Sequence, residues 1–538
     1  MMVTHEPEAS LPLTLAADSL PLPLYTVAQI RPLEQAAMAG MPPHALMARA
    51  GQAIAQFILE RLPASYGNGP RVWLAAGPGN NGGDALACAT ELHLRGVSVE
   101  VLLPSPPTAE DARWALERAR WASVPITTEW RGAPAFESQP AWFVDGLFGI
   151  GLGRPLEGVF AQVADYLSHC HREGHLVLAL DVPSGLDSDT GLAPAHSPVV
   201  NASHTLSFIG AKPGLFTGAG RDHAGSVWVA PLGLPAALEA PAHIAHLIAP
   251  VSFSAHLPRR SYATHKGSFG SLAVIGGADG MAGAPILAAR AALYAGAGKV
   301  HVALLTQRGP AFDSVHPELM INTIAELDWA SLTALAVGPG MGQSAAARQQ
   351  LKELLTHDLP KVLDADALNL IAGDAELGTL LRQHSDGVVL TPHPLEAARL
   401  LGQSTLEIQQ DRLRAAHALA ERYRCVVVLK GSGTVIASPE GPCALNPTGN
   451  AGLATGGTGD VLSGLLGALL AQGCATYPAA LAAVYLHGLS ADVLTSSGAG
   501  PTGLTAGELA PMFRTLLNRA VREADTPPSA PTPTADPL

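Results

Sequence analysis

Residues 456–460, Gly-Gly-Thr-Gly-Asp, join a glycine-rich turn to an apolar run that begins at Val461. Glycines let backbone N–H groups converge, and the free N–H groups of a first helical turn favour an anion. Asp460 fits the role of a base or a metal partner, because an unpaired carboxylate would repel bound phosphate. An ordinary Asp N-cap is the alternative. The segment therefore predicts a phosphate site at which Asp460 moves a proton.

Four loops in the first half of the chain carry polar residues directly after short apolar runs. They lie at residues 77–84, 145–154, 181–187 and 212–214. Any one of them is equally well explained as a Gly/Asp turn. Loops that follow parallel strands gather at one edge of the sheet, where ligands bind, so the four together predict a ligand site.

The second half places a larger set of glycine, lysine and acidic residues after apolar runs. No GxxxxGK[ST] motif occurs, which argues against a P-loop kinase. Asp364 and Asp366 could be a helix N-cap pair or could bind metal or water, and Lys266 could steer phosphate or be solvated. His393, between two prolines, could contact substrate or be a structural turn residue. The polar segments are residues 265–270, 276–285, 337–342, 364–369, 391–396, 430–434 and 456–460.

Parallel strands are required to position these loops. Apolar runs followed by glycine turns and helical segments occur in both halves, which predicts an α/β fold with two domains and parallel sheets covered by helices. The seam is expected within residues 231–257. The predicted strands are residues 72–76, 97–103, 142–144 and 176–180, then 271–275, 300–304, 334–337, 361–363, 387–390 and 425–429.

Composition restricts the class of protein. The 538 residues carry a formal net charge of −13 with 32 lysines and arginines, which argues against a nucleic-acid or anionic-membrane surface. The five scattered cysteines lack CxxC spacing and indicate reduced thiols of a cytosolic protein. The uncharged run 461–491 is long enough to span a bilayer, but we expect Gly473 and Pro478 to divide it into two buried helices, each too short to span.

Residues 25–235 resemble NAD(P)H-hydrate epimerases. The resemblance rests on residues 80–84, on Asp145 with residues 149–154, on 181–185, and on upstream residues that include Tyr25, Thr26, Arg31 and Glu34. It implies a Rossmann-like domain that interconverts the R and S hydrates of NADH and NADPH. Ala85 departs from the glycine usual in the family.

The resemblance also implies roles for single residues of this domain. Asn81, Asp145 and Ser184 would hold a potassium ion, and Asp181 would be the acid–base residue. The hydrate would be bound by Asn80, Asn81, Gly82, Gly83, Asp84, Gly149, Ile150, Gly151, Leu152, Gly153, Arg154, Pro155 and Asp181.

Residues 259–520 resemble the ADP/ATP-dependent NAD(P)H-hydrate dehydratases, a branch of the ribokinase-like fold. Asp460 would deprotonate the hydrate hydroxyl, which then attacks the terminal phosphoryl group of ADP or ATP, with Mg²⁺ bridging the nucleotide phosphates. Leu395 departs from a glycine frequent in the family. Ala284, Gly340, His393 and Asp460 would contact the hydrate, and Lys430, Gly431, Ser432, Gly433, Thr434 and Gly459 the adenine nucleotide.

The combined resemblance implies a bifunctional repair enzyme with a disordered leader (1–24), an epimerase domain (25–235), a linker (236–258), a dehydratase domain (259–520) and a disordered tail (521–538). We expect a cytoplasmic homo-oligomer that acts on the NADH and NADPH hydrates and an adenine nucleotide, not on nucleic acid or membranes. A small-molecule kinase with an accessory domain is one alternative, and it leaves the first-half loops unexplained. A first domain that only senses nucleotides or binds protein is another, and it has no need of Asp181.

Overall fold

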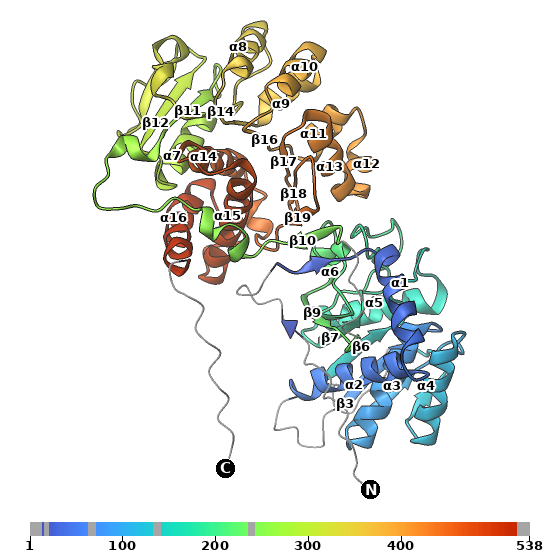
Figure 1. Cartoon of the computed structure of the whole chain (residues 1–538). Coiled ribbons are helices and arrows are strands. Elements are labelled where there is room, and N and C mark those ends of the chain that lie inside the picture. The colour runs from blue at the N-terminus through green and yellow to red at the C-terminus, as the bar shows by residue number, and fades with distance from the viewer. Residues whose placement is uncertain (1–12, 15–20, 63–70, 133–140, 235–242, 525–538) are drawn as a thin grey trace. The chain divides into compact units, whose positions relative to one another are not determined.

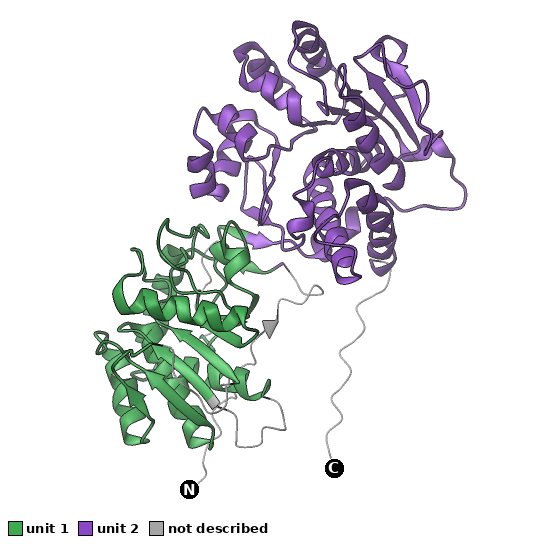
Figure 2. Ribbon diagram, turned by 180° about the vertical axis from the view of Figure 1, so that it is seen from behind, with its two compact units in different colours: residues 1–16, 22–245 green, residues 17–21, 246–538 purple. Residues whose placement is uncertain are grey.

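The computed structural model describes residues 13–14, 21–62, 71–132, 141–234 and 243–524. The chain divides into two compact units: unit 1 comprises residues 1–16 and 22–245, and unit 2 residues 17–21 and 246–538 (Figure 2). Each unit has a largely parallel sheet with helices packed on it (Figure 1). The predicted α/β class with two parallel-sheet domains is therefore confirmed.

The sheet of unit 1 has the order β1-β9-β8-β7-β6-β3-β4-β5. All neighbouring strands are parallel except β1 and β9. The predicted strands correspond to β3, β4, β6 and β7. The strands are β1 (Leu13–Thr14), β3 (Arg71–Ala76), β4 (Ser98–Leu102), β5 (Ile126–Thr127), β6 (Trp142–Gly146), β7 (Leu176–Leu180), β8 (His204–Phe208) and β9 (Ser226–Ala230).

Both faces of this sheet are buried. Along β3, Val72 and Leu74 pack with the core beneath α2 and α3, whereas Trp73 and Ala75 pack with the core beneath α5. Successive strand side chains point to opposite faces, so helices on both sides require an apolar run without alternation. The helices of unit 1 are α1 (Val27–Ala39), α2 (Ala45–Leu59), α3 (Asn80–Leu94), α4 (Glu110–Trp121), α5 (Gly158–Arg172) and α6 (Gly220–His223).

The sheet of unit 2 contains the order β13-β12-β11-β14-β15-β16-β17-β18-β19-β10. From β13 to β17 all pairs are parallel, and β18 and β19 continue antiparallel. The strands are β11 (Ser271–Gly276), β12 (Lys299–Leu304), β13 (Met320–Thr323), β14 (Ala334–Val337), β15 (Lys361–Leu363), β16 (Val388–Leu390), β17 (Val426–Leu429), β18 (Val435–Ala437), β19 (Cys443–Leu445) and β10 (Ala245–Leu247).

Helix α14 is the central helix of unit 2 and packs closely on α7. A Cβ atom on Gly464 would lie 1.9 Å from the carbonyl oxygen of Ala288, so only glycine permits this approach. The helices are α7 (Gly283–Tyr294), α8 (Ala345–Thr356), α9 (Ala365–Ala372), α10 (Ala375–Gln383), α11 (Pro394–Leu401), α12 (Thr405–Gln410), α13 (Arg412–Tyr423), α14 (Thr458–Ala471), α15 (Thr476–Ser496) and α16 (Ala506–Glu523).

The predicted disordered leader and the predicted linker both contain ordered residues. Leu13–Thr14 pairs antiparallel with β9, and Pro23–Leu24 forms the short strand β2, with Leu24 fully buried. In the expected linker, Phe253 and Leu257 belong to the hydrophobic core of unit 2. The chain passes from unit 1 to unit 2 at residues 245 and 246, so the end of the expected linker is part of the second unit. The tail beyond residue 524 lies outside the described residues.

The apolar run 461–491 forms two helices, α14 and α15, as predicted. The second helix is longer than predicted, because it begins before Pro478 and continues to Ser496. Pro478 lies in the first turn of α15, where a missing N–H costs no helical hydrogen bond, so the helix begins before it. Helix α15, with 21 residues, is the one described helix that is long and apolar enough to span a membrane. Of its most apolar window, 67% is buried within the protein, as in the core helix of a soluble domain.

Candidate active sites

In unit 1, Asp145 and Ser184 are held together at the carboxyl ends of β6 and β7. The Asp145 carboxylate accepts hydrogen bonds from the Ser184 backbone N–H (2.8 Å), the Ser184 hydroxyl (2.7 Å) and the Leu147 N–H (3.2 Å). Burial nevertheless raises the pKa of Asp145 to about 6. This fully buried carboxyl group would be stabilised as an anion by a nearby cation.

Asp181 follows β7 and has a left-handed backbone with φ of +64°. Its carboxylate forms a short ion pair with the ammonium group of Lys212, which is 1% exposed and also donates to the Ser207 hydroxyl (3.1 Å) and the Phe208 carbonyl (3.0 Å). The Phe208 N–H donates to the same carboxylate (3.3 Å). Asp181 is therefore the buried carboxylate that the sequence predicts, and Lys212 is a partner that sequence reasoning placed only in a nearby loop.

Two further carboxyl groups lie in the electrostatic field of Asp181. Burial, and then the charge of Asp181, raise the pKa of Glu34 on α1. Burial raises the pKa of Asp84 well above its ordinary value, and the charges of Asp181 and Glu34 act in the same direction. The positive charge of Lys212 acts to lower the pKa of Glu34, so the same cation stabilises the charged forms of both Asp181 and Glu34. Such mutual perturbation is typical of sites that transfer protons.

Asn81 belongs to the same candidate site of unit 1 as Asp181. Helix α3 begins at Asn80, so residues 80–84 form its first turn and not the loop that the sequence suggested. The Asn81 side chain is buried, and its amide oxygen and nitrogen have no hydrogen-bond partner among the residues that the structure describes. A Cβ atom on Gly149 would lie 3.1 Å from the Asn81 oxygen and 3.3 Å from an Asp181 oxygen. The structure thus brings together Asn81, Gly149 and Asp181.

The remaining residues predicted to bind the hydrate divide into two groups. Gly82 and Gly83 pack tightly, since Cβ atoms there would lie 1.9 Å from the Gly77 oxygen and 2.7 Å from the Met47 methyl group. Ile150 and Leu152 are half-buried in the loop between β6 and α5. The other members of that loop, Gly151, Gly153, Arg154 and Pro155, are exposed.

In unit 2, Asp460 lies in the first turn of α14. The helix begins at Thr458, earlier than the expected start near Val461, and Gly457 precedes it with φ of +91°. Burial, and then the charge of Asp364, raise the pKa of Asp460 to about 6, against an opposing effect of Lys430. No ion pair of Asp460 is found within the described part of the chain, which leaves this carboxylate free to accept a proton.

The partly buried Lys430 forms an ion pair with the buried Asp364, beside Asp460. The Lys430 ammonium lies 2.7 Å from one Asp364 oxygen, and the Ser463 hydroxyl donates to the other at 2.6 Å. Burial disfavours both charges, but the pair outweighs it, so the pKa of Lys430 is raised and that of Asp364 lowered. A Cβ atom on Gly459 would lie 3.4 Å from the Lys430 ammonium. The ammonium group therefore points at the N-terminus of α14.

The two acids for which an N-cap role was open make other contacts. Asp364 occupies the N-cap position of α9, but its side chain makes no capping hydrogen bond. Asp366 accepts from the Gly342 N–H (2.8 Å) and so ties the loop after β14 to α9. Asp364 thus stands at the N-cap position without a capping hydrogen bond from its side chain, and Asp366 lies in the first turn of the same helix. Lys266 is exposed.

His393 caps α11, and its Nδ1 accepts from the N–H groups of Leu395 (3.1 Å) and Glu396 (3.4 Å). Its Nε2 lies 3.4 Å from the carboxylate of Glu396. Burial, and then the nearby Lys430 charge, lower the pKa of His393, while burial raises the pKa of Glu396 to about 7. His393 is therefore a structural cap whose second nitrogen is directed at a buried acid, and sequence reasoning missed Glu396. The interval of three residues between them, that of a capping box, was the available signal.

The other predicted residues of unit 2 lie on the loops after β14 and β17 and at the start of α7. A Cβ atom on Gly340 would lie 3.4 Å from the Ala284 Cβ atom, so these two residues are neighbours. Residues 430–434 connect β17 to β18, and the Thr434 hydroxyl donates to the Gly431 carbonyl at 3.2 Å. The buried Arg412 guanidinium donates to the carbonyls of Leu429 and Lys430 and fixes the start of this loop.

Comparisons with known proteins match both units. A family model described as YjeF-related protein N-terminus matches residues 43–214, and one described as NAD(P)H-hydrate dehydratase matches residues 272–510. The bifunctional NAD(P)H-hydrate repair enzyme Nnr of Coxiella burnetii is 37% identical over 92% of this chain and 99% of its own length. The corresponding enzyme of Escherichia coli is 37% identical over 91% of this chain and 92% of its own.

Further matches cover unit 2 alone. The ADP-dependent (S)-NAD(P)H-hydrate dehydratase of Neisseria meningitidis is 46% identical over 49% of this chain and 90% of its own length. Among solved structures, an ADP/ATP-dependent NAD(P)H-hydrate dehydratase from Bacillus subtilis, co-crystallised with ATP and Mg²⁺, is 34% identical. It covers 51% of this chain and 98% of its own, with a TM-score of 0.44.

Proposed function

This chain belongs to the family of bifunctional NAD(P)H-hydrate repair enzymes, and we propose that it carries out both reactions of that family. Unit 1 interconverts the R and S hydrates of NADH and NADPH, and unit 2 dehydrates the S hydrate with ADP or ATP. One observation supports this proposal most strongly: each unit has its own acid–base aspartate, with a lysine nearby, at the carboxyl edge of its own sheet.

Epimerisation at the hydroxyl-bearing carbon needs a group that gives a proton to the leaving hydroxyl and accepts one from the water that adds. The hydrate hydroxyl sits on the carbon beside the ring nitrogen, whose lone pair expels it once a proton is supplied. The Asp181 and Lys212 pair supplies that proton, and water leaves. Water then adds to the other face of the planar intermediate and returns the proton to the pair. The buried position of both groups shields the intermediate from solvent.

Dehydration uses the nucleotide to convert hydroxide into a better leaving group. The Asp460 carboxylate removes the hydroxyl proton, and the hydroxyl oxygen attacks the terminal phosphoryl group, releasing AMP from ADP or ADP from ATP. The ring nitrogen lone pair then expels phosphate, and loss of a proton from the neighbouring carbon gives NADH or NADPH. Lys430, with the N–H groups of residues 457–459, stabilises charge on the transferred group.

We propose that unit 1 holds a potassium ion. The unpartnered Asn81 amide oxygen and the buried Asp145 carboxylate provide oxygen ligands, and the Ser184 hydroxyl, already bonded to Asp145, is the third. This set has too little charge to strip Mg²⁺ of its waters but suits a large monovalent ion supplemented by backbone carbonyls. When bound, the ion would neutralise Asp145 and tie together the start of α3, the end of β6 and the segment that follows β7.

Magnesium in unit 2 is proposed to come with the nucleotide. Among the described residues, no three His, Cys, Asp or Glu side chains are grouped so that they could hold a metal ion. A magnesium ion there would therefore take its ligands mainly from nucleotide phosphates and water, which is its usual preference.

The remaining proposals concern the whole molecule. We propose a cytoplasmic homo-oligomer that acts on small molecules without binding nucleic acid or membranes. The net charge of −13 and the five free cysteines support this environment. Light scattering of the purified protein measures the oligomeric state, and a monomeric mass would contradict the oligomer.

The direct test of function mixes R and S hydrates of NADH or NADPH with the protein and ADP, ATP or no nucleotide. Recovery of dihydronicotinamide absorbance from both epimers, only with a nucleotide present, is the expected result. Consumption of the S epimer alone would contradict the activity of unit 1, and no nucleotide dependence would contradict that of unit 2.

A further inference from the structure

A cavity of about 420 Å³ lies in unit 2 where several helices end. It is bordered by the C-terminal ends of α9, α11 and α13 and by the length of α10. Asp460, Lys430 and His393 are not among its lining residues. The cavity is therefore separate from the catalytic edge, and α11 runs between the two, from His393 at one end to Gly402 at the other.

Three arginines line this cavity, one from the last turn of each of three helices. They are Arg382 of α10, Arg399 of α11 and Arg422 of α13. Arg399 donates to the Asn369 side-chain oxygen (2.5 Å), and Arg422 lies 5.7 Å from the Tyr423 ring centroid. Within the described part of the chain, none of the three forms an ion pair with a carboxylate.

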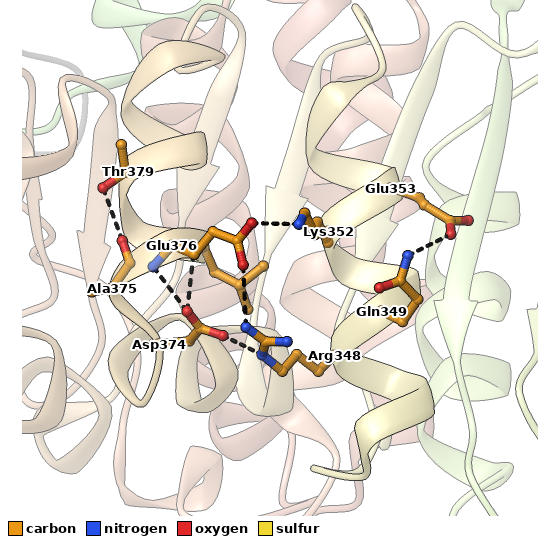
Figure 3. Close-up of polar contacts among 9 residues, drawn as sticks. Arg348, Gln349, Lys352, Glu353, Asp374, Ala375, Glu376 and Thr379 are labelled. Atoms are coloured by element: carbon orange, nitrogen blue, oxygen red, sulfur yellow. Dashed lines mark hydrogen bonds and ion pairs between the residues drawn. The ribbon is translucent and has the colours of Figure 1, made fainter.

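The acid that lines the cavity, Asp374, and its neighbour Glu376 form ion pairs with cations of α8. Figure 3 shows Asp374, which lines the cavity, and Glu376 directed at Arg348 and Lys352 of α8. Arg348 forms ion pairs with both acids, and Lys352 pairs with Glu376. The negative charges of Asp374 and Glu376 are thus balanced by the positive charges of Arg348 and Lys352. These four residues together add no net charge beside the cavity.

Helix ends offset only part of the arginine charge. A helix C-terminus carries roughly half a negative charge, so three of them supply about −1.5 against three positive side chains. The cavity retains a net positive charge of about 1.5 in a protein whose formal net charge is −13. All three arginines are exposed, so solvent weakens the repulsion between them, and a bound anion would lower it further.

We propose that this cavity binds a small polyanion that carries a pyrophosphoryl group. Guanidinium groups match phosphate oxygens with two parallel hydrogen bonds, and three around one cavity suit two linked phosphates. The volume falls within the range of cavities that hold nucleotide-sized ligands. Both inorganic pyrophosphate and the bridge of a dinucleotide have this chemistry.

Equilibrium dialysis of the full-length protein against labelled inorganic pyrophosphate, in magnesium-free buffer, tests the proposal. We expect one equivalent of pyrophosphate whose affinity falls at least tenfold in Arg422→Gln and in Arg382→Gln. Pyrophosphate held by the catalytic loops would remain in both variants. Unlabelled NAD⁺ that displaces this equivalent identifies a dinucleotide as the ligand, and lack of displacement identifies free pyrophosphate.

Arg414→Gln is the matched control, because Arg414 lies on the same helix α13 but does not line the cavity. It removes one positive charge and should bind pyrophosphate as the wild type does. Unchanged binding in Arg422→Gln and Arg382→Gln, or an equal loss in Arg414→Gln, would overturn the proposal. Thermal unfolding of the ligand-free variants verifies that each remains folded, and the two cavity variants alter different helices.

Discussion

The two units use the same pair of residue types in different arrangements. In unit 1 the lysine bonds to the proposed acid–base aspartate itself, Lys212 to Asp181. In unit 2 Lys430 bonds to a second aspartate, Asp364, and leaves Asp460 without an ion pair among the described residues. The first arrangement provides a donor and an acceptor in direct contact, whereas the second provides a base with a raised pKa beside a fixed positive charge.

This difference matches the two reactions. Epimerisation takes one proton from the acid–base pair and later returns one from the added water, so a bonded pair that regains its starting state is sufficient. Phosphoryl transfer needs a base for the hydroxyl proton and a separate cation for the transferred group. Asp364 keeps Lys430 available for that second task, because it prevents the lysine from pairing with Asp460.

The largest expected effect comes from Asp460→Asn. An amide cannot accept the hydroxyl proton, and loss of a general base costs about 10²–10⁴-fold in rate. Dehydration of S hydrate should fall by roughly a thousandfold, while ADP binding and epimerisation remain near wild type. Steady-state dehydration assays and ADP titration measure these quantities. A dehydration rate within tenfold of wild type would exclude Asp460 as the base.

Lys212→Met should be next in size and should affect only unit 1. The change removes the proton partner of Asp181 and keeps most of the apolar side chain, so epimerisation should fall by about a hundredfold. Dehydration of pure S hydrate should not change. Epimer exchange followed by chromatography measures the first rate. Normal exchange would mean that Lys212 only supports the fold of this loop.

Asp145→Ala should reduce epimerisation roughly tenfold through weaker substrate binding, because the proposed potassium ion loses its charged ligand. The Michaelis constant for the hydrate should rise more than kcat falls. A crystal grown in potassium should show an ion with oxygen ligands at about 2.7–3.0 Å, longer than the ~2.1 Å of magnesium. Full epimerase activity after exchange into choline buffer would contradict the ion.

The smallest effect concerns the pH dependence of dehydration. Asp460 acts as a base only when ionised, and its pKa is about 6, so the rate should fall as the pH drops through 6. Asp364→Asn removes a negative charge that raises the pKa of Asp460. The loss of dehydration rate at acidic pH should therefore occur at lower pH in this variant. Ser463→Ala is the control, because it removes a hydrogen bond to Asp364 but no charge. If the dehydration rate of Asp364→Asn falls at the same pH as that of the wild type, the carboxylates of Asp364 and Asp460 do not interact.

Sequence patterns predicted the central strands of both sheets, because strands buried on both faces read as short continuous apolar runs. β7, β14 and β15 have the predicted bounds. The strands β18 (Val435–Ala437) and β19 (Cys443–Leu445) were missed, because each is a short run between glycine, proline and polar residues that are typical of loops. The burial of Phe253 within the predicted linker was not foreseen, because this residue is isolated among alanines, prolines and polar residues.

Sequence analysis was weaker on side-chain partners than on the loops that carry them. It placed Asp364, Lys430 and Asp460 at one sheet edge, which the structure shows. It could not show that Lys430 forms its ion pair with Asp364 instead of Asp460. The two residues of this pair are 66 positions apart, and their contact depends on how β15 and β17 are aligned in the sheet. The pairing of Lys212 with Asp181 likewise depends on tertiary packing.

Complementation between two variants tests the central claim, that each unit carries a separate active site. Asp181→Ala should consume only the S hydrate, and Asp460→Asn should consume neither epimer while still exchanging them. Mixed together with ADP, the two variants should restore consumption of both epimers, because the epimer released by one chain is the substrate of the other. Failure of the mixture to consume R hydrate faster than spontaneous exchange allows would contradict two independent sites.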